Sequence, residues 1–325
     1  MTMSKLLELL VAHSGQYVSG EMISRELNVS RTAIWKQIHK LEDQGYEIEA
    51  SRRLGYKLIS VPDKYSLDDL NEQLQTAAFG RSIHLFEQVD STQNVAQKLA
   101  EEGAPEGTLV IAEQQLSGRG RMGRAWMSPK GKGVWMSLIM RPTIPVHFAP
   151  QLTLLTAVAL CRSLARLTSL PIGIKWPNDL LIDGKKISGI LLESTAEDAR
   201  LRYVIAGVGI SVNLASSDYP EEMQERVTSL RIASGERLSR EAVIAAFMLE
   251  WEQLYTLYQA EGFAPVVTLW EALSVSLNKP ARLTTPQGII DGTPVALDES
   301  GAIAVRLEDG NVVLVFSAEM GEPVT

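Results

Sequence analysis

Apolar segments with the length and composition of β-strands dominate the chain between residues 80 and 275, and few helical patterns interrupt them. The helical patterns lie near residues 92–102, 150–168 and 239–260. The strand-like segments are His84–Val89, Thr108–Glu113, Val134–Met140, Ile172–Lys175, Leu180–Ile182, Ile187–Glu193 and Arg202–Val212. A doubly wound parallel sheet needs a crossover helix between successive strands, so this order argues against that fold. We predict a mixed α+β sheet instead.

The remaining segments predict further domains, because a chain of 325 residues is too long for one ordinary hydrophobic core. Beyond the sheet region, short strands alternate with turns expected at residues 286–288, 299–301 and 309–310, which predicts a small β-barrel. The predicted divisions are a helical unit with a hairpin over residues 1–62, a linker helix over 63–80, the mixed sheet over 81–275 and the barrel over 276–325.

Composition and charge narrow the class of protein. Hydrophobic residues make up 45% of the chain and charged residues 22%, which is typical of a globular protein. The longest apolar run, Leu152–Leu167, contains Arg162 and Arg166 and is predicted to be a core helix rather than a membrane span. The N-terminus lacks a secretory apolar stretch, and the single cysteine, Cys161, cannot form an internal disulfide. We therefore expect a cytoplasmic protein without a membrane partner, and four histidines with one cysteine argue against a zinc site.

Residues 1–62 contain a helix with two distinct faces. Ser19 and Ser30 stand where the N-caps of a second and a third helix belong. On the third helix, Ile34, Ile38 and Leu41 form one stripe that should be buried. The residues that follow, 46–59, alternate in polarity as a hairpin does.

The opposite face of that third helix is polar and basic, as in the recognition helix of a helix-turn-helix. Arginine can pair with guanine edges, while lysine and serine can hold phosphates, and the hairpin would form a wing. Residues 1–61 carry eight basic and seven acidic side chains, a net charge of +1, whereas the whole chain carries -8. The candidate DNA-binding residues are Ser30, Arg31, Thr32, Trp35, Lys36, Arg52 and Arg53. A helical docking domain with a solvated charged face is the alternative. Trp35 could equally be a packing residue against the wing.

The segment Gly118–Arg124, with the sequence GRGRMGR, has the G-x-G-x-x-G spacing of a dinucleotide-binding turn. That turn needs a helix directly after it, whereas residues 125–140 are strand-like and broken by proline and glycine. The segment also lacks the lysine of a P-loop. We therefore predict a mobile cationic loop.

Three arginines in such a loop suit the activation of a carboxylate by ATP. That reaction brings two anions together, and unit charges about 4 Å apart repel by roughly 4 kcal/mol at an effective dielectric near 20. This repulsion corresponds to about three decades of rate. Fixed cations, and a loop that closes over the product, would offset it. A surface loop with solvated arginines is the alternative.

A second motif, Lys175-Trp176-Pro177-Asn178-Asp179, precedes a hairpin whose turn is predicted at Asp183-Gly184. The hairpin places Lys186 on a strand near this corner, where its ammonium could hold a carboxylate and a phosphate together. A lysine at a solvated strand end is an equally good interpretation of Lys186 alone. The combination with the arginine loop favours a site.

The chain resembles the biotin protein ligase family in three motifs and in their order. These are the arginine–glycine loop, the Lys-Trp-Pro-Asn-Asp corner and the strand Lys186-Ile187-Ser188-Gly189. Asp90-Ser91-Thr92 and Gly207–Asn213 match the same family. The resemblance covers nearly the whole chain, winged helix-turn-helix included, and so points to bifunctional members that join a biotin operon repressor to a ligase. It implies a catalytic domain related to class II aminoacyl-tRNA synthetases and an SH3-like C-terminal barrel.

The resemblance also implies an activity. Biotin and ATP, with Mg²⁺, would form biotinyl-5′-AMP, and biotin would then pass to a lysine of the biotin carboxyl carrier protein. With the adenylate bound, the protein would form a homodimer, bind operator DNA and repress genes of biotin synthesis or transport.

Residue roles follow from the resemblance position by position. Arg121 and Lys186 would be catalytic, because both would contact the carboxylate and phosphate region. The biotin-binding residues would be Ser91, Thr92, Gln93, Gln115, Arg119, Gly120, Arg121, Trp126 and Lys186. The nucleotide-binding residues would be Lys175, Asn178, Asp179 and Asn213, and the Mg²⁺ ligands stay unassigned.

Two other classes of protein fit part of this pattern. A lipoate protein ligase shares the chemistry but would lack the winged domain. A regulator that only senses an adenylate would have no need of Arg121, Lys175 and Lys186 together. Met122 and Ala318 depart from the family pattern, although neither removes a charge that the mechanism requires.

Overall fold

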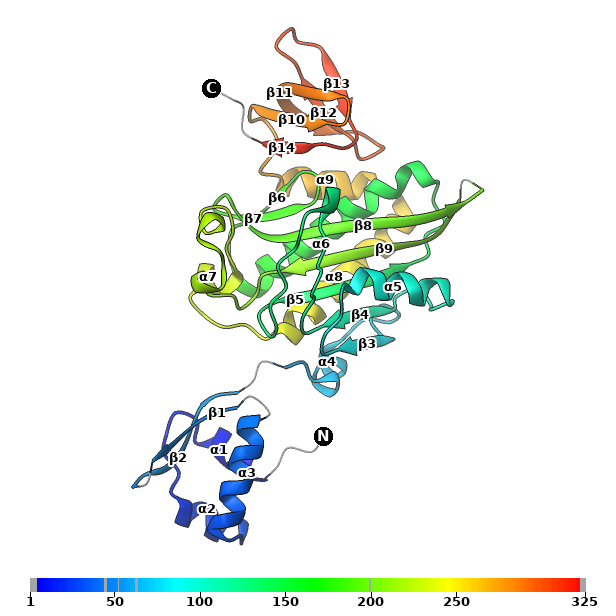
Figure 1. The fold of residues 1–325 in the computed structure, drawn as a ribbon. Helices are drawn as coiled ribbons and strands as arrows, with labels where there is room; N and C mark the ends of the chain where they lie inside the picture. The colour runs from blue at the N-terminus through cyan, green and yellow to red at the C-terminus, as the bar shows by residue number, and fades with distance from the viewer. Residues whose placement is uncertain (1–4, 44–45, 52, 62–63, 199, 322–325) are drawn as a thin grey trace. The chain divides into compact units, whose positions relative to one another are not determined.

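The computed structural model describes residues 5–43, 46–51, 53–61, 64–198 and 200–321. The chain divides into two compact units, residues 1–64 and residues 65–325 (Figure 1). Arg52, a predicted DNA-binding residue, lies outside the described residues.

The first unit has three helices followed by a two-stranded antiparallel hairpin, as predicted. Its elements are α1 (Lys5–Ala12), α2 (Gly20–Leu27), α3 (Arg31–Asp43), β1 (Glu47–Ser51) and β2 (Gly55–Ser60). The Ser19 hydroxyl accepts a hydrogen bond from Met22 N at 3.1 Å, and the Ser30 hydroxyl accepts one from Ala33 N at 3.2 Å. Both serines therefore cap the helices that they were predicted to open.

The core of the first unit is apolar and includes the predicted stripe. Ile34, Ile38 and Leu41 of α3 are all buried, together with residues of α1, α2 and β2. Gly55 opens β2 with a φ of +102°, and a Cβ there would lie 2.1 Å from Val18 O. Only glycine fits where the hairpin passes so close to the chain before α2.

The second unit is built on a seven-stranded sheet with the strand order β3-β4-β5-β9-β8-β7-β6. The strands are β3 (Ile83–Phe86), β4 (Leu109–Ala112), β5 (Val134–Met140), β6 (Ile172–Lys175), β7 (Asp179–Ile182), β8 (Lys185–Glu197) and β9 (Arg200–Ile210). The pair β3–β4 is parallel and the other neighbouring pairs are antiparallel. The sheet is therefore mixed, which confirms the predicted fold class.

Helices cover both faces of this sheet, because successive strand residues point to opposite sides. The helices are α5 (Thr92–Glu101), α6 (Ala149–Thr168), α7 (Leu230–Ser234), α8 (Arg240–Glu261) and α9 (Ala264–Leu273). Leu109 and Ile111 of β4 pack into the large core with α6 and α8, whereas Val110 packs with α5. Helices α5, α6 and α8 were predicted, whereas α7 and α9 were not.

The most apolar helical stretch is Val146–Thr168, which contains α6. By length and composition it could cross a membrane, but 72% of its most apolar window is buried inside the structure. It packs against α8 and α9. This burial agrees with the predicted core helix.

Residues 67–73 form α4, but this helix is not a separate spacer between domains. Leu70, Leu74 and Phe79 are buried in the same core as α6 and α8. The carboxylate of Glu252 on α8 also accepts hydrogen bonds from the backbone of residues 77–79. Apolar burial therefore makes the predicted linker part of the second unit.

The C-terminal segment is a five-stranded antiparallel sheet with the order β13-β12-β11-β10-β14. Its strands are β10 (Ala281–Thr285), β11 (Gly288–Leu297), β12 (Ile303–Arg306), β13 (Val312–Val315) and β14 (Glu319–Gly321). Three of its four connections fall at the predicted turns. Leu283, Ile303 and Val305 belong to the large core of the second unit.

Candidate active site

A cavity of about 430 Å³ opens in the second unit between the large sheet, the arginine–glycine loop and the C-terminal sheet. It brings together residues that are far apart in the sequence. The predicted biotin and nucleotide residues in its lining are Ser91, Thr92, Gln93, Gln115, Arg119, Gly120, Arg121, Trp126, Lys175, Asn178, Asp179 and Lys186.

One end of the cavity is a buried hydrogen-bond network at the start of α5. The Gln115 side-chain oxygen accepts from Thr92 N at 2.9 Å and from Thr92 Oγ1 at 3.1 Å. The Ser137 hydroxyl donates to Gln93 Oε1 at 2.9 Å and lies 2.9 Å from Thr92 Oγ1. Such a network fixes the orientation of each amide and hydroxyl, which suits recognition of a small polar ring. Ser137 could not be predicted from the sequence, because one serine in an apolar strand has no motif around it.

The floor of the cavity is formed by glycines on β8 and β9. Gly189 pairs with Gly209 across the two strands. A Cβ on Gly209 would lie 2.3 Å from Trp126 Nε1, and one on Gly207 would lie 2.6 Å from Gln93 Oε1. The glycines therefore leave the space that the Trp126 ring and the Gln93 amide occupy.

The arginine–glycine loop forms a short turn that no helix follows, as the sequence predicted. Gly120 N donates to Arg124 O at 2.7 Å, and Trp126 N donates to Gly118 O at 2.8 Å. A Cβ on Gly118 would lie 2.5 Å from Trp126 O, so the crossing needs glycine. The loop then continues toward β5. No helix N-terminus follows to bind a pyrophosphate in the dinucleotide manner.

Arg121 connects this loop to the Lys175–Asp179 corner and to the segment before β14. Its guanidinium donates to Asn178 Oδ1 at 3.2 Å and to Ser317 Oγ at 2.8 Å. Burial lowers the pKa of Arg121 from its usual value, and the carboxylates of Asp179 and Glu319 oppose this shift. A guanidinium remains charged even so, and partial burial strengthens its attraction for an anion.

Lys186 enters the cavity lining from β8. Its ammonium nitrogen is 2.6 Å from Asp179 Oδ1 and 5.3 Å from the centroid of the Trp126 ring. Lys175 enters the same lining from the end of β6. Arg119, by contrast, is half-exposed and lies 3.5 Å from Glu193 Oε2.

The C-terminal sheet supplies residues that the sequence analysis did not assign to the site. Arg282, Thr284, Ala318, Glu319 and Met320 line the cavity. Glu319 forms an ion pair with Arg124 of the loop. No local pattern in residues 276–325 indicates this role, because it depends on how the sheet packs against the loop.

Asn213 is the predicted nucleotide residue that the structure places outside the cavity lining. Its side chain is buried, where Nδ2 donates to Leu238 O at 2.9 Å and Oδ1 accepts from Leu238 N at 3.0 Å. Its backbone N–H donates to Lys132 O at 2.6 Å. In the structure it therefore holds the segment before α8 against the end of β9.

The predicted DNA-binding face of the first unit is exposed. Ser30, Arg31, Thr32, Lys36 and Arg53 are exposed. Trp35 is 54% exposed and makes an edge contact with His39 of its own helix, with ring centroids 4.2 Å apart. It does not belong to the apolar core.

Comparison with known proteins assigns a class to each unit. Residues 85–211 match the biotin/lipoate A/B protein ligase family, and residues 2–57 match a helix-turn-helix domain. The chain is 43% identical to the bifunctional ligase/repressor BirA of Bacillus spizizenii over 97% of both chains. It is 31% identical to the Escherichia coli protein of the same name, over 94% of this chain and 92% of that one.

The solved structures agree. The biotin protein ligase of Aquifex aeolicus, in complex with biotin and ATP, is 28% identical with a TM-score of 0.64, over 74% of this chain and 98% of that one. The fold and the cavity thus define a ligase-type catalytic unit joined to a helix-turn-helix. The chain belongs to the biotin protein ligase family, among its bifunctional ligase/repressors.

Proposed function

We propose that this chain is an ATP-dependent biotin–protein ligase that also represses transcription in response to biotin. The main support for the ligase activity is the cavity, which combines a polar pocket, a floor of glycines and several cationic side chains. The repressor half rests on the helix-turn-helix unit with its exposed basic face. Full-length relatives named for both activities support this reading over a lipoate ligase.

The chemistry proceeds in two steps. A biotin carboxylate oxygen attacks the α-phosphorus of ATP, the bond to the leaving diphosphate breaks, and biotinyl-5′-AMP forms. The neutral amine of a carrier-protein lysine then attacks the acyl carbon. The bond to AMP breaks with its electron pair on the phosphate oxygen, and the amine loses a proton.

Arg121 and Lys186 are the proposed catalytic residues. Both line the cavity and both lie beside the Asn178–Asp179 corner, where a carboxylate and a phosphate must approach each other. Their charge offsets the repulsion of the two anions and stabilises the crowded transition state. Asn178 and Asp179, with Lys175, lie beside them for the nucleotide, and the Ser91–Gln93 segment with Gln115 would hold the ureido ring.

Mg²⁺ is proposed to enter with the nucleotide. Asp179 and Glu319 are carboxylates in the lining, but no group of three or more His, Cys, Asp or Glu side chains in the described part of the chain could hold a metal. This donor set fits Mg²⁺, which commonly takes one or two carboxylates together with substrate phosphates and water. Bound there, the ion would neutralise phosphate charge.

The repressor activity is proposed to depend on dimerisation. One winged domain makes few phosphate contacts, so a single copy should bind DNA weakly at physiological salt. A dimer makes the second contact intramolecular and raises the effective affinity. We propose that biotinyl-5′-AMP promotes the homodimer, that residues 1–62 read the operator, and that the protein works in the cytoplasm, where ATP and the carrier protein are available.

The deciding experiment is ATP–pyrophosphate exchange by the full-length chain. Exchange should require biotin, and lipoate should not replace it. Transfer of labelled biotin to a carrier domain completes the test. A chain that catalyses no exchange would instead be a regulator that only senses ligand.

A second measurement tests the repressor half. Sedimentation and operator titrations, each with and without biotin and ATP, should show tighter association and tighter DNA binding with ligand. Unchanged values in both would contradict the repressor proposal and leave the ligase proposal intact.

A further inference from the structure

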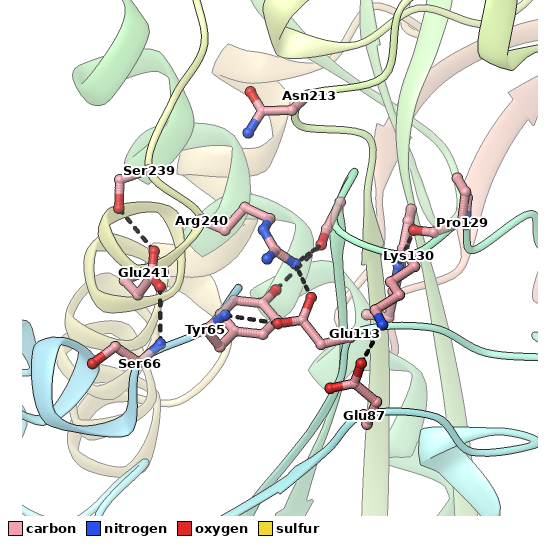
Figure 2. Close-up of polar contacts among 12 residues, drawn as sticks. Tyr65, Ser66, Glu87, Glu113, Pro129, Lys130, Asn213, Ser239, Arg240 and Glu241 are labelled. Atoms are coloured by element: carbon pink, nitrogen blue, oxygen red, sulfur yellow. Dashed lines mark hydrogen bonds and ion pairs between the residues drawn. The ribbon is translucent and has the colours of Figure 1, made fainter. Parts of the chain in front are cut away.

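A cluster of buried charged and aromatic residues lies in the second unit and takes no part in the chemistry above (Figure 2). Arg240, at the start of α8, is 0% exposed, and Glu113, directly after β4, is 4% exposed. Tyr65, the first residue of the second unit, is also buried beside them. All three converge near the backbone of Gly133.

The contacts within this cluster are close and complementary. Arg240 Nη1 donates to Glu113 Oε2 at 2.9 Å and to Gly133 O at 3.3 Å. Tyr65 N donates to Glu113 Oε1 at 2.7 Å, and the Tyr65 hydroxyl donates to Gly133 O at 3.2 Å. The guanidinium of Arg240 lies 4.0 Å from the centroid of the Tyr65 ring. Each Glu113 oxygen thus has its own donor.

Stability alone is a weak explanation for such an arrangement. A buried ion pair often adds little over apolar residues of the same volume, because both charges lose their hydration. The pair does fix the orientation of the Glu113 carboxylate, because each of its oxygens accepts a hydrogen bond from a different donor.

The cluster contacts the segment after β4 and the segment that opens β5, and each of these leads to a residue at the polar end of the cavity. Gln115, which accepts from Thr92, stands two residues after Glu113. The backbone of Glu113 also accepts from Gly131 N at 3.3 Å, just before β5. Ser137, which also belongs to the polar end, lies on β5 four residues after Gly133.

We propose that Glu113, held by Arg240 and Tyr65, is a positioning residue for the ligand head group. It sets the place of the Gln115 amide relative to Thr92 and Ser137. This role rests on the proposed biotin ligase function. Because Tyr65 is the first residue of the second unit, the chain that arrives from the first unit is anchored at this cluster.

The test uses the full-length chain and compares Glu113→Gln with Glu252→Gln. Glu252 lies on α8 and is a matched control, because it too is a carboxylate of the second unit that accepts backbone N–H groups, in this case those of Ala77, Ala78 and Phe79. In biotin-dependent exchange, Glu113→Gln should raise the KM for biotin about tenfold, since a small misplacement of a binding group is costly. The KM for ATP should stay within about twofold, a selectivity that general destabilisation would not give.

The control should leave both KM values within about twofold while lowering the melting temperature. Tyr65→Leu is a milder second variant, since it keeps the backbone N–H and removes only the ring contact and the hydroxyl. It should raise the KM for biotin about threefold and decides the matter if Glu113→Gln does not fold. If the KM for biotin of Glu113→Gln and Tyr65→Leu matched that of Glu252→Gln, the positioning role would be overturned. Absence of biotin-dependent exchange in the unsubstituted chain would instead overturn the proposed function, and this role with it.

Discussion

The two units differ in what they bury. Among the described residues, the first unit buries apolar side chains in its core and exposes its functional ones, such as Arg31 and Lys36. The second unit buries polar and charged groups, including Gln93, Ser137 and Arg240. A surface that meets DNA can stay solvated until contact, whereas a site for a small molecule must hold desolvated polar groups in place beforehand.

This contrast has an energetic consequence. Exposed side chains can be replaced at small cost to stability, because few contacts depend on them. Buried polar groups are coupled to one another, so replacing one affects its neighbours.

The largest effect is expected for Lys186→Met. Removing the ammonium leaves the approaching carboxylate and phosphate without one of their fixed cations, so the rate of exchange should fall roughly 10²–10³-fold. Lys185→Met is the matched control, because Lys185 is adjacent and exposed and bonds Gln224 O. Steady-state exchange kinetics of both variants provide the measurement. Equal losses in both would show that Lys186 acts only through the fold.

A smaller effect is expected for Gly209→Ala. A Cβ there would lie 2.3 Å from Trp126 Nε1, so the indole ring must leave the floor of the cavity. Overpacking of this kind costs about 1–3 kcal/mol, and we expect biotin affinity to fall about thirtyfold. Titration calorimetry with biotin measures this, and Gly20→Ala serves as the control because Gly20 has open space around it. Unchanged affinity would mean that Trp126 does not need the glycine floor.

In the first unit, Arg31→Ala should weaken operator binding about tenfold, since one base or phosphate contact contributes roughly 1–3 kcal/mol. Biotin-dependent exchange should stay the same, because Arg31 is exposed and belongs to the other unit. Operator titrations over a range of salt concentrations distinguish the two kinds of contact. If the slope of log affinity against log salt concentration falls in magnitude by about one, Arg31 contacts a phosphate. If the slope is unchanged, Arg31 contacts a base. No change in affinity would remove Arg31 from the DNA-binding face.

The contrast between the units also explains what the sequence could predict. In the first unit, the helical spacing of Ile34, Ile38 and Leu41 was enough to separate the buried face from the exposed one, because a helix repeats every 3.6 residues. In the second unit, local sequence motifs predicted the loop and the Lys175–Asp179 corner, because glycine and proline strongly favour turns and loops. The mixed sheet followed from the order of strands and helices.

What the sequence could not predict depends on packing between distant segments. Ser137 and Glu319 join the cavity only because β5 and the C-terminal sheet lie beside the loop. The resemblance that assigned Asn213 to the nucleotide does not predict the hydrogen bonds between its buried side chain and Leu238. The sequence likewise predicted the helix at residues 67–73 but not its packing, because burial of Leu70 against α8 is a tertiary property.

The smallest effects are expected from a matched pair of helix caps, one in each unit. Ser19 caps the eight-residue α2, and Ser66 caps the seven-residue α4, each by accepting a backbone N–H at 3.1 Å. Replacing either serine with alanine removes one acceptor, so each should lose about 1 kcal/mol of stability. Ser19→Ala should lower only the unfolding transition of the first unit, because its core shares no residue with the other unit. Ser66→Ala should lower only that of the second unit, where α4 is packed on α8. Calorimetry resolves the two unfolding transitions. The transition at which exchange activity is lost is that of the second unit. If both caps shifted both transitions equally, the units would unfold together, and the difference in what they bury would not make them independent.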